Sequence, residues 1–218
     1  MPAGATPPAA TTPPVSEGNA DPVQNWAELS LPEGDHDEDT LPLVVLLRGG
    51  ALNERANGAD DVRDIARSLT ARGMAVYNVE YRDRDSENGG WPETYTDAAD
   101  GLDHIPEVDE QGPEIITEGA TVVGHSSGAQ LATWAATRDN LDPDEVGADP
   151  TFTPSRVVSL AGPPDLEWDV RNGADNTYEV LGGTAELVLL DGGDHVSFLR
   201  KGTPDFERLI DIVVDAAG

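Results

Sequence analysis

Cysteine is absent from this chain of 218 residues, and lysine occurs once, at Lys201, so arginine supplies the rest of its 13 basic residues. Without a thiol, disulfides, thiolate zinc sites and cysteine nucleophiles are excluded. No apolar stretch approaches the ~20 residues that cross a bilayer, and the first residues have neither the basic start nor the apolar run of a secretory signal. Dinucleotide and phosphate-loop fingerprints and clusters of metal ligands are also lacking, so we expect no cofactor and no metal.

Acidic residues, in contrast, are abundant. The chain has 42 of them, which gives a net charge of 13 − 42 = −29. Such a charge repels phosphates, so nucleic acid and anionic membranes are not expected partners. It also destabilises the compact state unless salt screens it. Because the acids are spread along the chain, the sequence predicts a halophilic protein of a high-salt cytoplasm.

Composition divides the chain into two parts. Residues 1–20 are rich in proline, alanine and threonine and carry Glu17 as their single acid, so we expect a leader without a core. Residues 21–218 are expected to form one domain, of unknown oligomeric state, because this length can bury a sizeable core.

Apolar runs and helical periodicity alternate through the domain. We expect buried strands at 43–47, 75–81, 120–124, 156–161 and 186–190, and an edge strand near 26–31. Between and after them, apolar residues at helical spacing predict helices at 60–72, 95–105, 128–138 and 206–214. This alternation is typical of an α/β fold whose mostly parallel sheet has helices on both faces.

The sharpest chemical motif is Gly124-His125-Ser126-Ser127-Gly128, between a predicted strand and a predicted helix. A sharp strand-to-helix turn needs small flanking residues because its backbone is strained. The turn lifts the Ser126 hydroxyl above the sheet, where the helix amino terminus favours a developing oxyanion. The motif predicts a nucleophilic serine.

A serine nucleophile needs a base, and the chain has four histidines. We expect His125 to point away along its strand in a structural role, His36 to lie in an acidic loop, and His104 to lie opposite the apolar face of its helix. His195 follows the last predicted strand, in the region where loops gather at the carboxyl edge of a parallel sheet. His195 is therefore the predicted base.

An oxyanion hole would complete this chemistry. One donor is expected from the Ser127 N–H, directly after the nucleophile. The second is expected near Gly50 and Ala51, where glycine lets backbone N–H groups approach a ligand.

With these residues in place, the chain resembles the α/β-hydrolase fold, and within it the esterase-like and arylformamidase-like enzymes with a His-Gly-Gly loop. The similar segments run from about Asp21 to the end, and they include 43–50, 79–82, 90–92, 124–128, 158–162 and 192–195. The resemblance implies hydrolysis of a small-molecule ester or amide without choosing the substrate.

Two departures from that family stand out. Arg48-Gly49-Gly50 replaces the usual His-Gly-Gly, so a guanidinium is expected beside the site. In addition, residues 162–184 leave room for one strand–helix–strand crossover of about 30 residues, strands included, whereas the family usually has two further strands there. The strand that usually precedes the triad acid is therefore expected to be missing.

The triad acid must then come from another segment of the chain. Asp165 is the best candidate, because it follows the 156–161 strand and keeps the order serine, acid, histidine. Asp191 and Asp194 lie too close to His195 to be favoured, and Asp175 is a third choice. An alternative is that Asp165 only caps a turn or a helix.

The sequence therefore predicts a cytoplasmic serine hydrolase, favoured as a carboxylesterase, that uses Ser126, His195 and Asp165. One alternative is a catalytically impaired remnant that acts as a binding protein or has no activity. A further alternative is an amide hydrolase of arylformamidase or peptidase type.

Overall fold

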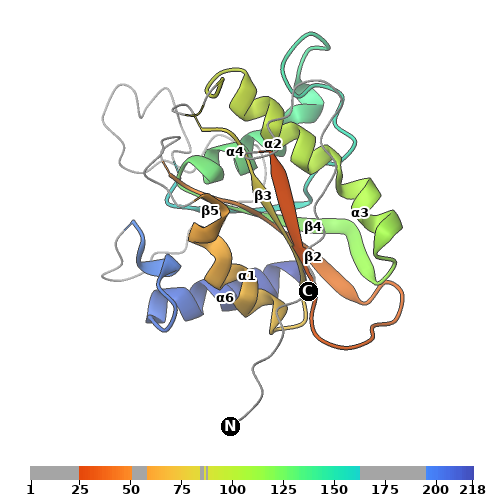
Figure 1. Ribbon diagram of the computed structural model, residues 1–218, viewed down its shortest axis with the longest axis vertical. Helices are drawn as coiled ribbons and strands as arrows, with labels where there is room; N and C mark the ends of the chain where they lie inside the picture. The colour runs from red at the N-terminus through yellow and green to blue at the C-terminus, as the bar shows by residue number, and fades with distance from the viewer. Residues whose placement is uncertain (1–24, 51–57, 84–85, 87, 163–194) are drawn as a thin grey trace.

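The structure is a computed structural model, which describes residues 25–50, 58–83, 86, 88–162 and 195–218. Within these residues one sheet crosses the molecule, with helices on both of its faces (Figure 1). Its strands are β1 (Trp26–Ser30), β2 (Leu41–Leu47), β3 (Ala75–Glu80), β4 (Ile115–His125) and β5 (Arg156–Leu160). The α/β fold class expected from the alternation is confirmed.

The strand order is β1-β3-β2-β4-β5. Strand β1 pairs antiparallel with β3 as an edge strand, and the other neighbouring pairs are parallel. Strands β2 and β4 lie side by side with Leu47 opposite Gly124, so the Gly49-Gly50 turn and the serine motif leave the sheet at the same edge. This shared edge is where loops of open α/β sheets bind ligands.

Alternation along the strands divides the core into two layers. On one face, Leu43, Val45 and Leu47 of β2 pack with the helices α2 (Glu93–Asp103), α3 (Ile105–Gln111) and α4 (Ser127–Ala135). On the other face, Val44 and Leu46 pack with α1 (Arg63–Thr70) and α6 (Pro204–Ala217). Both faces of β2 are therefore buried, as its continuous apolar run predicts.

Several element bounds differ from the expected ones. The predicted 60–72 helix begins as the 3₁₀ helix η1 (Gly58–Val62) before α1 starts. The predicted 95–105 helix ends at Asp103, and α3 begins at Ile105. Pro106 explains this break, because it has no N–H to donate to the carbonyl of Leu102. Two short 3₁₀ helices, η2 (Arg138–Asn140) and η3 (Ser197–Leu199), were not predicted.

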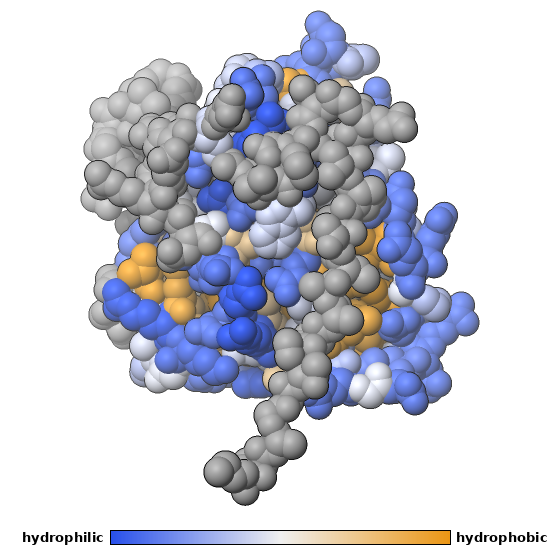
Figure 2. All heavy atoms as spheres, in the orientation of Figure 1, coloured by the Kyte–Doolittle hydropathy of each residue, from blue (hydrophilic) through white to orange (hydrophobic). Residues whose placement is uncertain are grey.

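The surface of the described residues is mostly polar. In Figure 2 hydrophilic residues occupy the periphery of the view, and apolar residues show in a band across its middle. Trp91 and Val196 are the exposed large hydrophobic side chains within the described ranges, with exposed fractions of 70% and 36%. None of the helices that the structure describes has the length and apolar character of a membrane span.

Candidate active site

The serine motif forms a strained turn between β4 and α4. Ser126 has φ 54° and ψ −116°, a conformation that residues with a side chain rarely adopt. Its N–H donates to the carbonyl of Leu160 at 2.8 Å, which ties the turn to the end of β5. Helix α4 begins at the next residue, so the first N–H groups of the helix, including that of Ser127, lie beside the serine and have no intrahelical partner.

The two glycines of the motif are required by close backbone contacts. A methyl group on Gly124 would lie 2.1 Å from the carbonyl oxygen of Gly128. One on Gly128 would lie 2.2 Å from the carbonyl oxygens of Leu47 and Arg48. The second pair of contacts also shows that the end of β2 runs against the start of α4. Both glycines are therefore needed for this packing and not only for the turn itself.

His195 lies beside the serine. Its Nε2 is 3.0 Å from the Oγ of Ser126, within hydrogen-bond reach. Ser126 is half-buried and His195 is exposed, so the pair is open to solvent. The structure thus brings together the two residues that the sequence predicts as nucleophile and base, although they are 69 positions apart.

His125 has a more specific position than the sequence indicates. Its side chain is buried, with an exposed fraction of 5%, and its Nε2 is 3.1 Å from the carbonyl oxygen of His195. Its ring lies against the rings of His195 and Phe198, with centroid distances of 5.1 and 5.2 Å. Burial lowers the pKa of His125 to about 4, so its imidazole is neutral near pH 7. The expected structural role is thus a contact with the predicted base.

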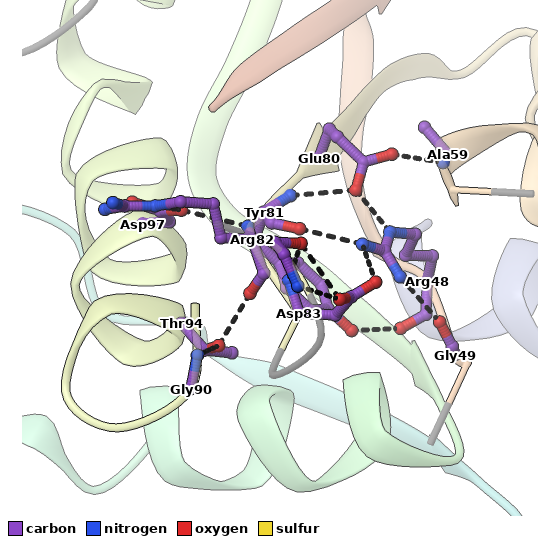
Figure 3. A network of polar contacts seen from close by, with 11 residues as sticks. Arg48, Gly49, Ala59, Glu80, Tyr81, Arg82, Asp83, Gly90, Thr94 and Asp97 are labelled. Atoms are coloured by element: carbon purple, nitrogen blue, oxygen red, sulfur yellow. Dashed lines mark hydrogen bonds and ion pairs between the residues drawn. The ribbon is translucent and has the colours of Figure 1, made fainter. Parts of the chain in front are cut away.

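The side chain of Arg48 is buried in a network of polar contacts (Figure 3). Its Nε pairs with the carboxylate of Glu80, and its other nitrogens donate to the carbonyls of Gly49 at 3.1 Å and Tyr81 at 2.7 Å. The Tyr81 hydroxyl donates in return to the carbonyl of Arg48 at 2.6 Å. The guanidinium is also 3.8 Å from the carboxylate of Asp83. The guanidinium expected beside the site is thus paired with acids on and after β3.

Glu80 extends this network to the loop that follows Gly50. Its Oε2 accepts the N–H of Ala59 at 2.6 Å, while Asn78 donates from its side chain to the carbonyl of Ala59 at 3.0 Å. Both contacts hold the start of η1, where the chain returns from residues 51–57. No local pattern indicates these contacts, since Glu80 and Asn78 lie 21 and 19 positions from Ala59.

A second buried ion pair fixes α2 against the end of β3. Arg82 donates to both carboxylate oxygens of Asp97, at 2.8 and 2.7 Å, and the side chain of Asp97 has an exposed fraction of 0% (Figure 3). Thr94 adds a bond from its hydroxyl to the carbonyl of Arg82 at 2.6 Å. These contacts place the start of α2 at the same edge of the sheet as the Ser126–His195 pair.

Other predicted site residues fall partly outside the described ranges. Gly50 lies just past β2, half-buried, at the same edge of the sheet as Ser126. Ala51, Asp165 and the alternative acids Asp175, Asp191 and Asp194 lie outside the described residues, as does the predicted strand at 186–190. Within the ranges that the structure covers, no carboxylate oxygen lies within 4.0 Å of a His195 ring nitrogen, so the acid stays a prediction.

Metal-ligating residues do not gather around Ser126 among the residues that the structure describes. A group of three or more histidine, aspartate or glutamate side chains able to hold an ion is not found in the described part of the chain. His36 is engaged locally, with Nε2 3.2 Å from the carbonyl oxygen of Pro32, and His104 lies 3.5 Å from the carboxylate of Glu107. Both are remote in sequence from the Ser126–His195 pair.

A mostly parallel sheet, a serine on a strained strand-to-helix turn and a histidine beside it define the class of α/β-hydrolases. The model of one family, BD-FAE, matches residues 28–189, which is well over half of the chain. The chain belongs to the BD-FAE family. A search of curated proteins gave no match.

Solved structures of esterases share the fold. Esterase B from Lactobacillus rhamnosis, in a C6-C4 SN3 inhibited form, is 20% identical with a TM-score of 0.62, and the match covers 76% of this chain and 52% of that one. A truncated carbohydrate esterase from gut microbiota is 19% identical, with a TM-score of 0.55 and coverages of 74% and 59%. A butyrate-bound thermophilic esterase from Thermogutta terrifontis is 15% identical, with a TM-score of 0.53 and coverages of 67% and 56%. The chain thus spans little more than half of each of these proteins.

Proposed function

We propose that the protein is a serine hydrolase that cleaves a carboxylic ester, with Ser126 as nucleophile and His195 as general base. The observation that carries the proposal is the 3.0 Å separation of Ser126 Oγ and His195 Nε2 at a strained turn. A free serine hydroxyl is a weak nucleophile, and an adjacent base within this distance activates it.

The reaction follows from the geometry. His195 Nε2 takes the proton of the Ser126 hydroxyl while Oγ attacks the ester carbonyl carbon, which forms a tetrahedral oxyanion. When the intermediate collapses, the C–O bond to the alcohol breaks and His195 returns the proton to the leaving oxygen. Water then repeats the sequence on the acyl-enzyme, which releases the acid and frees Ser126.

The amino terminus of α4 suits the oxyanion. The N–H of Ser127 is one proposed donor, and the N–H groups of Gly50 or Ala51 are proposed for the second. The nine-residue helix adds the positive end of its dipole beneath the same atom. Asp165 is proposed to orient His195 from the loop after β5.

The solved relatives favour an ester over an amide. They are esterases, one with butyrate bound and one with a tributyrin phosphonate. We therefore propose a small substrate with a short acyl chain. An amide substrate of the arylformamidase or peptidase kind is the alternative within the same mechanism.

A catalytically impaired remnant is the second candidate. It is favoured by the sequence of residues 162–184, which is too short for the two further strands that the resemblance implies before the triad histidine. Loss of the acid alone reduces turnover by about 10⁴ in the triad template and does not abolish it.

The ionic environment of the protein is proposed from its net charge alone. With a net charge of −29, the folded chain repels itself in dilute buffer, and concentrated salt removes most of that repulsion. We therefore propose a halophilic protein in a high-salt cytoplasm. Its activity is best assayed in about 2 M KCl, where charges are screened.

A substrate panel tests the reaction. Wild type and Ser126→Ala are compared on p-nitrophenyl esters of increasing acyl length and on the matching anilides. We expect ester turnover that is highest for short acyl chains and lost in Ser126→Ala. Turnover of anilides alone would favour the amide alternative, and turnover of neither would favour the remnant.

A second variant tests the acid. Asp165→Asn removes the carboxylate and keeps the shape of the side chain, and we expect kcat to fall by up to about 10⁴. Asp144→Asn, at an exposed aspartate that is not a candidate for the acid, is the matched control and is expected to keep wild-type turnover. Unchanged turnover in Asp165→Asn would remove that residue from the mechanism.

A further inference from the structure

Three segments of the site meet at one side chain that the reaction itself does not use. His125 precedes the serine, its Nε2 contacts the carbonyl of His195, and its Nδ1 faces the turn after β2. A methyl group on Gly49 would lie 2.5 Å from that Nδ1, so the turn packs directly on the ring. The nucleophile, the predicted base and the oxyanion turn thus share one buried neighbour.

The hydrogen bond determines which nitrogen of the His125 ring carries the proton. A carbonyl oxygen only accepts, so the proton must be on Nε2 of His125, which donates to His195 at 3.1 Å. Nδ1 then carries a lone pair, and it is buried without a hydrogen-bond partner among the described residues.

The contact with His125 restricts the position of His195, the proposed base. His195 is exposed, its backbone carbonyl accepts a hydrogen bond from the ring of His125, and the two rings also contact each other. Phe198 of η3 closes on the other side of the His125 ring, with centroids 5.2 Å apart. Proton transfer requires Nε2 of His195 to stay within hydrogen-bond reach of Ser126, and displacements of about 1 Å cost about 10²-fold in rate.

We propose that His125 is a positioning residue, which holds the backbone of His195 so that the imidazole stays within reach of Ser126. This inference rests on the proposed hydrolase function. It assigns no chemical step to His125, whose ring neither gives nor takes a proton during turnover.

Two substitutions separate the hydrogen bond from the packing. His125→Phe keeps a ring and removes the donor, whereas His125→Gln places an amide N–H close to the position of Nε2. We expect His125→Phe to lower kcat and the rate of fluorophosphonate labelling by about 10- to 100-fold with little change in KM, and His125→Gln to recover most of that loss. His36→Phe is the matched control, because it also loses an Nε2 contact with a carbonyl, at 3.2 Å, and it is expected to match wild type.

A loss confined to His125→Phe supports the proposal, and wild-type rates in that variant would overturn it. If His125→Phe does not fold, His125→Asn replaces it, because its shorter amide does not reach the carbonyl of His195. Equal rates in the asparagine and glutamine variants would then overturn the proposal.

A measurement independent of turnover distinguishes this inference from the proposed function. Ring nitrogen resonances of isotope-labelled wild-type protein are expected to show His125 protonated on Nε2, with a slowly exchanging proton, and the His195 resonances are expected to move in His125→Phe. An Nδ1-protonated His125, or an unmoved His195, would overturn the inference. An inactive wild type with the expected resonances would refute the hydrolase and leave the positioning contact standing.

Discussion

At the scale of single residues, the site depends on side chains that the surrounding backbone holds in unfavourable states. Ser126 has a positive φ, which costs about 1–3 kcal/mol, and its bond to Leu160 and the packing of Gly128 hold it there. His125 is buried with one nitrogen unpaired within the described residues. Both costs are local, and both lie at the proposed reaction centre.

The buried state of His125 predicts a pH dependence of stability. Burial, together with the neighbouring His195, lowers its pKa to about 4, while the bond to the His195 carbonyl and the Asp61 carboxylate act in the opposite direction. The unfolded chain binds this proton below about pH 6.5, and the folded chain does not until about pH 4. The free energy of unfolding therefore falls as the pH drops through this window, by at most about 1.4 kcal/mol per unit.

Urea unfolding of wild type and His125→Phe between these pH values measures the effect. Burial also lowers the pKa of His104, so the difference between the two proteins isolates His125. We expect the stability of wild type to decline more steeply with acid than that of His125→Phe. Parallel curves would show that His125 titrates normally.

At the scale of elements, a buried charge network joins β2, β3 and η1. Arg48 directly follows β2, Glu80 ends β3, and Ala59 is the second residue of η1. The side chains of Arg48 and Glu80 have exposed fractions of 4% and 8%. Removing one partner of such a pair leaves a buried charge, which costs more than the pair itself contributes.

This network predicts a non-additive pair of substitutions. Arg48→Met is expected to lower the free energy of unfolding by about 3–5 kcal/mol, since Glu80 and Asp83 lose their cation. Combining it with Glu80→Gln is expected to cost less than the sum of the single changes, by about 0.5–3 kcal/mol. Arg63→Met, which breaks a largely exposed pair with Asp60, is the control and is expected to cost under about 1 kcal/mol. Additive losses in urea unfolding would contradict the network.

The elements also show what the sequence can predict. Strands β2 and β3 lie where apolar runs indicate, because burial on both faces leaves a local pattern. Strand β5 also lies at its predicted place. The break between α2 and α3 was not predicted, since the apolar face continues through Ile105 while Pro106 interrupts the hydrogen bonds. Ser126 and His195 could be proposed as site residues because each follows a predicted strand. The partners of Arg48 and His125 could not be predicted, because contacts between distant positions leave no local pattern in the sequence.

At the scale of the whole molecule, the buried core stabilises the fold and the net charge opposes it. The described part has two buried core layers around five strands. The net charge of −29 opposes this compact state through repulsion between surface carboxylates.

Screening predicts a strong salt dependence. We expect Tm to rise between about 50 mM and 2 M KCl, as the Debye length falls to a few ångströms. Sucrose stabilises compact states by exclusion without screening charge, so it is expected to raise Tm less at equal osmolality. Equal stability in dilute buffer and in KCl would contradict the proposed adaptation to salt.

The reactivity of Ser126 tests the central claim most directly. Wild type and Ser126→Ala are incubated with a fluorophosphonate in about 2 M KCl, and the modified peptide is identified by mass spectrometry. A single label on Ser126, absent from Ser126→Ala and strongly slowed in His195→Ala, is predicted by a serine activated by the histidine 3.0 Å away. Folded wild-type protein that takes up no label, or labels equally in all three proteins, would contradict the account.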